Sequence, residues 1–367
     1  MNQTILLAAG GTGGHLFPAT ALAQELTRRG FVVELATDER AEQYGTDFPA
    51  RAVYRVPSAT FSGRSPGAVM KTLSTLGKGY FRARRLLEMV QPHVVVGFGG
   101  YPTLPPLLAA RSLAIPTVLH EQNAVMGRAN RLLSRFADAI ALSFDTTKHL
   151  RSSAEKRAVV TGNPVRDAVV SCRDQAYAAP ESAGRLLLLV FGGSQGARFF
   201  SEMIPQALAQ LPSPLRWRLT VVQQARPEDV AEVRDAFREA EVTAHVAPFF
   251  QDLPERIAGS HLVISRAGAS TVAEVTAIGR PAILVPLPHA IDNDQLENAR
   301  RLEDNGGGWC LHQSGITPES LAARLEQLLS NPDVLAKAAD NSRAMGNVYA
   351  VNRLADLVAD LAGPDQK

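Results

Sequence analysis

Short apolar runs alternate with longer segments of helix-like spacing along most of the chain. The run at residues 4–9 is almost entirely apolar, which is typical of a strand buried on both faces. Residues 16–26 follow with apolar positions at helical spacing, and Pro18 is tolerated in the first turn. Further strands are predicted at residues 31–37, 51–56, 92–98, 115–123, 137–143, 185–191, 219–223, 243–246, 261–265 and 280–286. Strands that alternate with helices predict the α/β class with doubly wound parallel sheets.

The second half of the chain repeats the opening. The apolar run at 185–191 leads into Gly192-Gly193, as the first run leads into Gly10-Gly11. A chain of 367 residues also exceeds what one hydrophobic core usually supports. The repeat therefore predicts two similar α/β domains. Their expected bounds are residues 1–165 and 166–345, with a C-terminal helix at 346–363 that packs back onto the first domain.

A glycine-rich loop connects the first strand to the first helix. Its sequence is Gly-Gly-Thr-Gly-Gly at residues 10–14, followed by His15. Such a junction presents backbone N–H groups to a polar ligand, although the spacing fits neither a dinucleotide fingerprint nor a P-loop. A helix N-terminus disfavours the imidazolium, so His15 should stay neutral and able to accept a proton. The alternative is a tight strand-to-helix turn that a histidine happens to close.

Composition narrows the class of protein. With 38 basic and 36 acidic residues, the chain has no global charge signal for nucleic acid. Cys172 and Cys310 are too few for a disulfide framework, which favours a reduced, cytoplasmic setting. The first strand begins too early for a signal peptide, and no apolar run approaches the ~20 residues that span a bilayer.

Residues 65–90 combine helical spacing with an excess of basic side chains, and no acid occurs before Glu88. Each of these residues, taken alone, is compatible with an ordinary surface helix whose apolar stripe packs on the sheet. The alternative is a patch that lies in the plane of an anionic membrane surface, where each basic group adds ~1 kcal/mol. The residues of this predicted membrane patch are Val69, Met70, Lys71, Leu73, Leu76, Lys78, Phe81, Arg82 and Arg85.

The strand at 115–123 ends in four polar residues, His-Glu-Gln-Asn at 120–123. Strand ends near residues 10, 99 and 120 would line one edge of a parallel sheet, so we expect the polar tail to face a cleft there. The alternative is that it caps the helix that begins near Met126.

In the second half, residues 266–274 run from a strand into a helix. Gly268 or Ser270 can cap that helix, whose free N–H groups suit phosphate. Glu274 could accept both hydroxyls of a ribose; alternatively, it is a favourable acid in the first helical turn. Asp292-Asn293-Asp294 has a spacing known from metal sites, but acids at a helix start need no metal, so no metal is expected.

Together, six motifs closely resemble the MurG family, bacterial enzymes that add GlcNAc from UDP-GlcNAc to lipid I and so form lipid II for peptidoglycan. The motifs are Gly-Gly-Thr-Gly-Gly-His at 10–15, His-Glu-Gln-Asn at 120–123, Gly-Asn-Pro-Val-Arg at 162–166, Gly-Gly-Ser-Gln-Gly-Ala-Arg at 192–198, Arg-Ala-Gly-Ala-Ser-Thr-Val-Ala-Glu at 266–274, and the polar cluster at 295–298. The resemblance implies a GT-B fold, in which two Rossmann-like domains face each other across a cleft, with no metal and no cofactor.

The resemblance also implies roles for individual residues. Ser194 and Arg166 would hold the diphosphate of UDP, Glu274 the ribose, and the backbone near Phe250 the uracil. Gln295 and Asn123 would contact the GlcNAc hydroxyls. The remaining implied contacts are Gly268, Ala269, Ser270 and Thr271 by the phosphates, and Thr12, Gly13 and Gly14 by the transferring sugar. The chain departs from the family pattern at two places. Several relatives have Ser-Gly-Ala-Leu-Thr where this chain has Ala-Gly-Ala-Ser-Thr at 267–271. The loop at 289–295 is about one residue longer than in some relatives.

Under this resemblance His15 is the base that deprotonates the C4 hydroxyl of the acceptor, and a single displacement inverts the donor linkage. The chain would sit peripherally on the cytoplasmic face of the bacterial inner membrane. Its partners would be UDP-GlcNAc, lipid I, an anionic lipid surface and other cell-wall synthesis or division proteins, with no nucleic acid. Two alternatives stay open: another GT-B transferase that uses a UDP-sugar and a different glycolipid, and a non-catalytic nucleotide-sugar binding protein.

Overall fold

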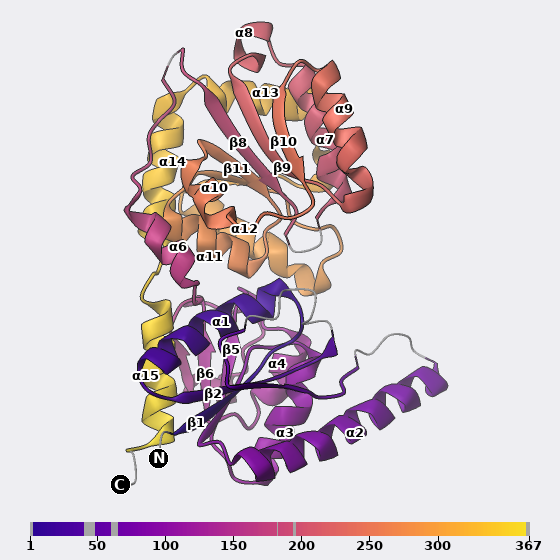
Figure 1. The fold of residues 1–367 in the computed structure, drawn as a ribbon, viewed down its shortest axis with the longest axis vertical. Helices are drawn as coiled ribbons and strands as arrows, with labels where there is room; N and C mark the ends of the chain where they lie inside the picture. Colours follow the sequence, from indigo (N-terminus) through magenta and orange to yellow (C-terminus); the bar gives the residue numbers. More distant parts are fainter. Residues whose placement is uncertain (1–2, 40–47, 60–64, 182, 194–195, 365–367) are drawn as a thin grey trace. The chain divides into compact units, whose positions relative to one another are not determined.

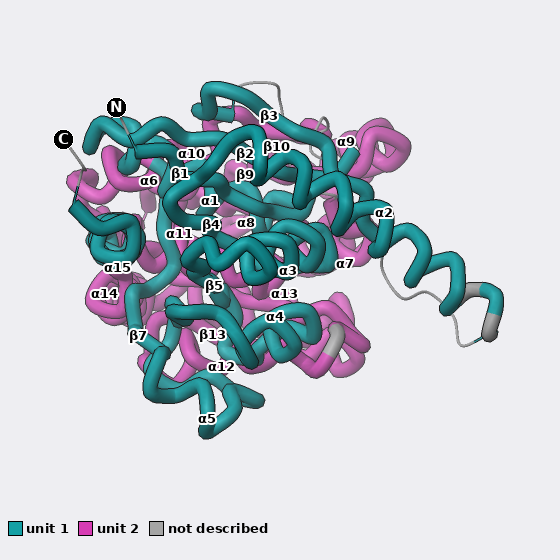
Figure 2. The backbone as a smooth tube through the Cα atoms, turned by 90° about the horizontal axis from the view of Figure 1, so that it is seen from below, with its two compact units in different colours: residues 1–166, 348–367 teal, residues 167–347 magenta. Residues whose placement is uncertain are grey.

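The computed structural model describes residues 3–39, 48–59, 65–181, 183–193 and 196–364. The chain divides into two compact units (Figure 2). Unit 1 comprises residues 1–166 and 348–367, and unit 2 comprises residues 167–347.

Unit 1 is built on a parallel sheet whose described strands follow the order β3-β2-β1-β4-β5-β6-β7. β1 pairs with both β2 and β4, so the strand order reverses there. The strands are β1 (Thr4–Ala8), β2 (Val32–Thr37), β3 (Ala52–Arg55), β4 (Val94–Gly97), β5 (Thr117–Glu121), β6 (Ala139–Leu142) and β7 (Ala158–Val160). Because the pairings are parallel, the loops after β1, β4 and β5 leave from one edge of the sheet, as predicted.

Helices cover both faces of this sheet (Figure 1). They are α1 (Gly13–Arg28), α2 (Pro66–Val90), α3 (Leu104–Ser112), α4 (Arg128–Leu133), α5 (Ser152–Glu155) and α15 (Ala350–Ala362). In β1, Ile5 and Leu7 belong to a core shared with α1 and α15, whereas Leu6 belongs to the core shared with α2 and α3. Burial of both faces explains why β1 is a continuous apolar run.

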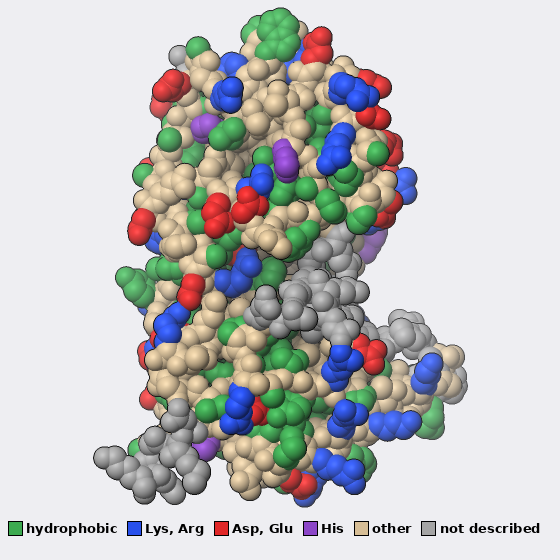
Figure 3. All heavy atoms as spheres, in the orientation of Figure 1, with side chains coloured by type: hydrophobic (Ala, Val, Ile, Leu, Met, Phe, Trp, Pro, Cys, Tyr) green, Lys and Arg blue, Asp and Glu red, His purple; other side chains and the backbone are tan. Residues whose placement is uncertain are grey.

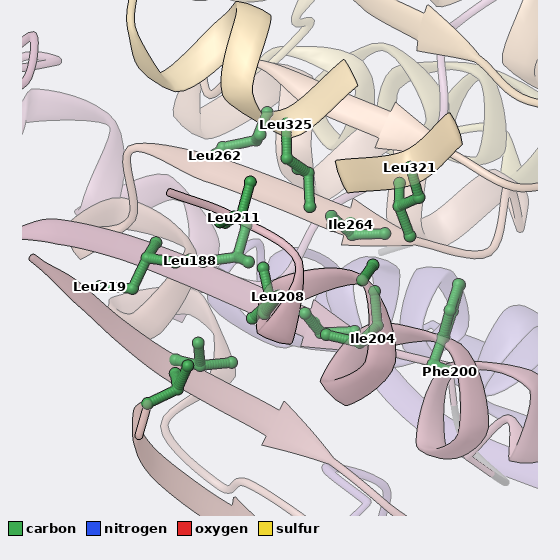
Figure 4. Close-up of a cluster of buried hydrophobic side chains, with 14 of the residues drawn as sticks. Leu188, Phe200, Ile204, Leu208, Leu211, Leu219, Leu262, Ile264, Leu321 and Leu325 are labelled. Atoms are coloured by element: carbon green, nitrogen blue, oxygen red, sulfur yellow. The ribbon is translucent and has the colours of Figure 1, made fainter. Parts of the chain in front are cut away.

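Unit 2 has the same kind of sheet, in the order β10-β9-β8-β11-β12-β13 for the described strands. The strands are β8 (Leu186–Phe191), β9 (Leu219–Gln224), β10 (Thr243–Ala247), β11 (Leu262–Ser265), β12 (Ala282–Leu284) and β13 (Gly308–Cys310). The helices are α6 (Asp167–Ser171), α7 (Arg198–Ala209), α8 (Ser213–Arg216), α9 (Val230–Glu239), α10 (Leu253–Gly259), α11 (Ala269–Ile278), α12 (Asp294–Asp304), α13 (Pro318–Leu329) and α14 (Pro332–Met345). Leu188, Ile204 and Leu325 show how β8, α7 and α13 share one core (Figure 4).

The predicted α/β class with two doubly wound parallel sheets is confirmed. The strands β7 and β13 are not among the predicted ones. Each has three residues and lies at the edge of its sheet. Val159 and Val160 of β7 are exposed, so neither a buried run nor an alternating pattern marks that strand.

Candidate active site

The glycine loop of unit 1 holds His15 in the first turn of α1. Thr12 is the N-cap of this helix, in extended conformation, and its backbone carbonyl oxygen accepts a hydrogen bond from the backbone N–H of His15 at 3.0 Å. The imidazole lies against Gly99 and Gly100, which follow β4 and have φ values of 84° and 76°. A Cβ on Gly100 would come within 3.2 Å of the His15 Nε2 atom. The pairing of β1 with β4 thus brings a second glycine turn to the histidine.

Asp38 is a member of this loop region that the sequence analysis missed. It directly follows β2, and its Oδ1 accepts a hydrogen bond from the backbone N–H of Gly11 at 3.0 Å. The carboxylate therefore fixes the start of the glycine loop from the neighbouring strand. The polar pair Thr37-Asp38 at the end of a buried strand is the sequence feature that could have indicated this contact.

The polar tail of β5 has mainly a structural role. His120, Glu121 and Gln122 are all buried, so the expectation that they face a cleft is wrong for these three. The Glu121 carboxylate accepts hydrogen bonds from the Gly127 backbone N–H at 2.9 Å and from Asn130 Nδ2 at 2.7 Å. It thereby holds the residues that begin α4, which is the alternative the sequence left open.

His120 is a neutral, fully buried imidazole. Burial lowers its pKa from the usual 6.5 to about 4, and nearby His15 also disfavours its charged form. Its Nε2–H donates to the Gly162 carbonyl oxygen at 3.1 Å, and Nδ1 accepts from Gln122 Nε2 at 3.1 Å. These two contacts fix the tautomer and join the end of β5 to the segment that leads out of β7.

The His120 contacts predict a stability change with pH. The unfolded imidazole takes up a proton near pH 6.5, whereas the folded one does so only near pH 4. The free energy of unfolding, which is at its full value above pH 6.5, therefore decreases by about 3 kcal/mol as the pH falls to 4. We expect the difference in unfolding free energy between wild type and His120→Gln to shrink by that amount, in urea titrations at pH 7 and pH 4. A difference that does not change with pH would contradict the prediction; His312→Gln, at an exposed site, is the control.

Asn123 is the member of the tail with a partly exposed side chain. Its backbone N–H and its Nδ2 both donate to Glu121 Oε1, at 3.0 and 3.3 Å. Glu121 therefore orients the amide that the family resemblance assigns to the sugar. Arg166, the last residue of unit 1, places its guanidinium 4.1 Å from the centroid of the Phe17 ring on α1.

In unit 2, α11 begins directly after β11 as the motif at 266–274 predicts. Gly268 is the N-cap, in extended conformation, and no side chain caps the helix, so Ser270 does not have that role. Ser270 and Thr271 are partly exposed, whereas Ala269 is buried. Glu274 is only 4% exposed and lies beyond the first turn, which rules out the first-turn alternative. Ser270 and Glu274 are four residues apart and lie on one face of the helix.

Arg266 is a second residue that the sequence analysis did not single out. It lies between β11 and α11 and is 8% exposed. Its Nη1 donates to the carbonyl oxygens of Val285 and Pro286 at 3.1 and 3.3 Å, and its guanidinium lies over the ring of Phe200. Burial lowers its pKa. Among the described residues no carboxylate pairs with it, so it leaves a positive charge close to the N-terminus of α11.

The other predicted donor contacts in unit 2 lie on loops or at the start of a helix. Gln295, in the first turn of α12, accepts a hydrogen bond from the Leu287 backbone N–H at 3.0 Å through Oε1. The loop it closes contains three left-handed residues other than glycine. Phe250 is buried beneath Arg256, at 4.4 Å, so its backbone rather than its ring is the group that a ligand could reach. Ser194 lies outside the described residues. Two residues before it, the Gly192 N–H donates to Gln224 Oε1 at 3.1 Å.

Metal ligands do not cluster in the described part of the chain. No group of three or more His, Cys, Asp or Glu side chains there is placed to hold a metal ion. Asp292 and Asp294 flank the left-handed Asn293 at the start of α12.

Comparison with known proteins decides the family. The model of the glycosyltransferase family 28 N-terminal domain matches residues 5–142, and that of the family 28 C-terminal domain matches residues 187–358. The chain belongs to glycosyltransferase family 28. Both glycine loops and α11 lie within the matched ranges.

Individual relatives within family 28 match almost the whole chain. The UDP-N-acetylglucosamine--N-acetylmuramyl-(pentapeptide) pyrophosphoryl-undecaprenol N-acetylglucosamine transferase of Methylobacterium sp. is 54% identical over 98% of this chain and 96% of its own length. The protein of that name from Rhodospirillum centenum is 53% identical over 98% of this chain and 94% of its own. The crystal structure of Acinetobacter baumannii MurG superposes with a TM-score of 0.76 at 32% identity, covering 97% of this chain and 99% of that one. The MurG resemblance and the GT-B fold class are confirmed.

The helix α2 of this family 28 chain carries the predicted membrane patch. Its N-terminal part extends beyond the rest of unit 1, and basic side chains gather along it (Figures 2 and 3). Met70 and Phe81 are 69% and 67% exposed, whereas Leu76 is partly buried. Packing of α2 against unit 1 therefore leaves part of its apolar stripe exposed to solvent. No helix in the described part of the chain is long and apolar enough to cross a membrane.

Proposed function

We propose that the chain transfers GlcNAc from UDP-GlcNAc to the C4 hydroxyl of the MurNAc in undecaprenyl-pyrophosphoryl-MurNAc-pentapeptide, lipid I, and so forms lipid II for peptidoglycan synthesis. The observation that carries the proposal is that relatives named for this transfer share about half of all residues over 98% of the chain. The second support is chemical, because each unit has a glycine loop that leads into a helix.

Unit 2 is proposed to bind the donor. Glu274 accepts the ribose hydroxyls, and the N-terminus of α11 with Ser194 receives the diphosphate. The buried charge of Arg266 supports this assignment, because it strengthens the positive potential at the same strand end. The other proposed donor contacts are Arg166, Gly268, Ala269, Ser270, Thr271, the backbone near Phe250, and, for the sugar, Gln295 and Asn123.

Unit 1 is proposed to bind the acceptor, with His15 as the base. Thr12, Gly13 and Gly14 are proposed to lie close to the GlcNAc that is transferred from the donor. The acceptor oxygen bonds to C1 of GlcNAc as the bond from C1 to the diphosphate oxygen breaks. The leaving UDP keeps the bonding electron pair, and His15 takes the hydroxyl proton. A single displacement of this kind inverts the donor linkage.

The experiment that tests this function measures GlcNAc transfer from radiolabelled UDP-GlcNAc to a lipid I analogue, with and without EDTA. We expect transfer, and we expect it to be unaffected by EDTA because metal-independent catalysis is part of the proposal. UDP binding without transfer to lipid I, but with transfer to another glycolipid, would replace the acceptor. UDP binding with no transfer at all would favour a binding protein.

The peripheral membrane location is also a proposal, and it rests on α2. Its basic and apolar side chains suit an anionic lipid surface at the cytoplasmic face of the inner membrane, where lipid I is embedded. Cell-wall synthesis and division proteins are proposed as further partners at that membrane.

Removing the two most exposed apolar side chains of the patch should weaken vesicle binding. Met70→Ser with Phe81→Ser is expected to lower affinity for vesicles of phosphatidylcholine and phosphatidylglycerol by about a hundredfold or more, because each buried side chain contributes about 1.5–3 kcal/mol. Co-sedimentation measures the effect. Trp217→Ser, which removes an equally exposed side chain from unit 2, is the control. Unchanged vesicle binding in the double variant would exclude α2 as the anchor.

A further inference from the structure

A basic hollow on unit 1 belongs to none of the functions assigned so far. Its volume is about 420 Å³, within the range of ligand pockets. The lining residues are Arg128, Arg131, Leu132, Arg135, His149 and Arg151. Four arginines and a histidine thus meet in one place, and no carboxylate is among the described residues that line it.

One wall of the hollow is a single face of α4 and the turn that follows it. Residues 128, 131, 132 and 135 are spaced by three and four, so their side chains lie on one side of the helical path. Arg131 is held there, because its Nε donates to the Met126 carbonyl oxygen at 2.7 Å. Leu132, which is 42% exposed, adds an apolar surface between the arginines.

The other wall comes from residues 148–151, which are tied to the segment before α4. The Met126 backbone N–H donates to the Lys148 carbonyl oxygen at 2.9 Å, and the Lys148 N–H donates to the Ala124 carbonyl oxygen at 2.8 Å. His149 has the left-handed φ of 64°, which turns the chain at the hollow. Backbone hydrogen bonds therefore fix both walls against each other.

We propose that this hollow binds a phosphate group, carried either by a lipid headgroup or by a water-soluble organic phosphate. Planar guanidinium groups donate paired hydrogen bonds to phosphate oxygens, and several arginines together neutralise a multiply charged anion. Like charges so close together repel one another, and a bound anion relieves that repulsion. Leu132 offers a contact for the carbon atoms attached to the phosphate. The helix α3 packs against both α4 and α2, so the hollow and the membrane patch belong to one helical layer of unit 1.

The test uses the full chain saturated with UDP, so that phosphate cannot occupy the donor site. Isothermal titration with glycerol 3-phosphate compares wild type with Arg135→Ser/Arg151→Ser, which keeps the arginine that is bonded to backbone. We expect one site in wild type and about tenfold weaker binding in the variant, because charge-assisted hydrogen bonds are lost. Arg111→Ser/Lys156→Ser removes the same charge from exposed positions outside the hollow and is the matched control. The unfolding midpoint of each variant verifies its fold.

A vesicle assay then distinguishes the two sources of phosphate. Weaker binding of the hollow variant to equimolar phosphatidylcholine–phosphatidylglycerol vesicles, with unchanged binding to pure phosphatidylcholine, identifies a lipid headgroup. Unchanged binding to both vesicles, together with weaker glycerol 3-phosphate binding, identifies a soluble phosphate. The proposal is overturned if the hollow variant binds glycerol 3-phosphate and the phosphatidylglycerol vesicles as tightly as wild type does. It is also overturned if the control variant loses as much affinity for these probes as the hollow variant. None of these readouts depends on glycosyl transfer.

Discussion

Replacing His15 with alanine is expected to lower kcat for GlcNAc transfer by about 10²–10⁴-fold, the usual contribution of a general base. The imidazole lies in the first turn of α1 against two glycines, so it can be removed without disturbing a packed core. Steady-state transfer to a lipid I analogue measures the effect.

His312→Ala is the matched control, since it removes an exposed histidine from unit 2. UDP affinity of His15→Ala should stay within about twofold of wild type, because His15 is not among the proposed contacts of UDP. If transfer by His15→Ala persists within a few-fold, another group is the base. If UDP affinity falls together with transfer, His15 acts in donor binding instead.

Glu274→Gln is expected to raise KM for UDP-GlcNAc by about 10–100-fold with a smaller effect on kcat. Two hydrogen bonds from ribose hydroxyls to a carboxylate would become weaker bonds to a neutral amide, and bonds to charged groups contribute about 1.5–3 kcal/mol each. The amide has nearly the same size as the buried carboxylate, so packing within α11 is kept.

A donor that lacks the ribose 2′ hydroxyl shows whether Glu274 acts on the ribose. Wild type should lose affinity for this donor, whereas Glu274→Gln should lose much less, because the interaction is already weakened. Glu239→Gln, on the exposed side of α9, is the control for loss of one negative charge. Equal losses for the two enzymes would assign Glu274 a purely structural role.

The sequence was sufficient for the sheets and the glycine loops because both leave local signals. A strand buried on two faces, such as β1 or β8, is a continuous apolar run bounded by glycine. The turn after β4 likewise has a signal in the sequence, the pair Gly99-Gly100. Both residues have a left-handed conformation, which only glycine adopts readily.

The roles of polar residues could not be predicted in the same way, because they depend on partners far away in the chain. The contact of His120 with Gly162 joins β5 to the segment after β7, and that of Asp38 with Gly11 joins the segment after β2 to the loop after β1. Likewise, nothing in the motif around Arg266 indicates that its guanidinium is enclosed by Phe200 and by the carbonyl groups after β12. Motif spacing indicates that a site exists; burial decides which of its residues are available to a ligand.

Unit 1 is formed by two segments from opposite ends of the chain, and this affects the order in which the two units can fold during synthesis. Leu354 and Val358 of α15 lie in the same core as Ile5 and Leu7 of β1, and Arg29, the C-cap of α1, pairs with Asp356 at 2.6 Å. The part of that face that α1 does not cover stays exposed until α15 has been synthesised, while the continuous unit 2 can already be complete. Unit 1, although most of it is made first, therefore gains its full core only after residues 348–367 have been synthesised.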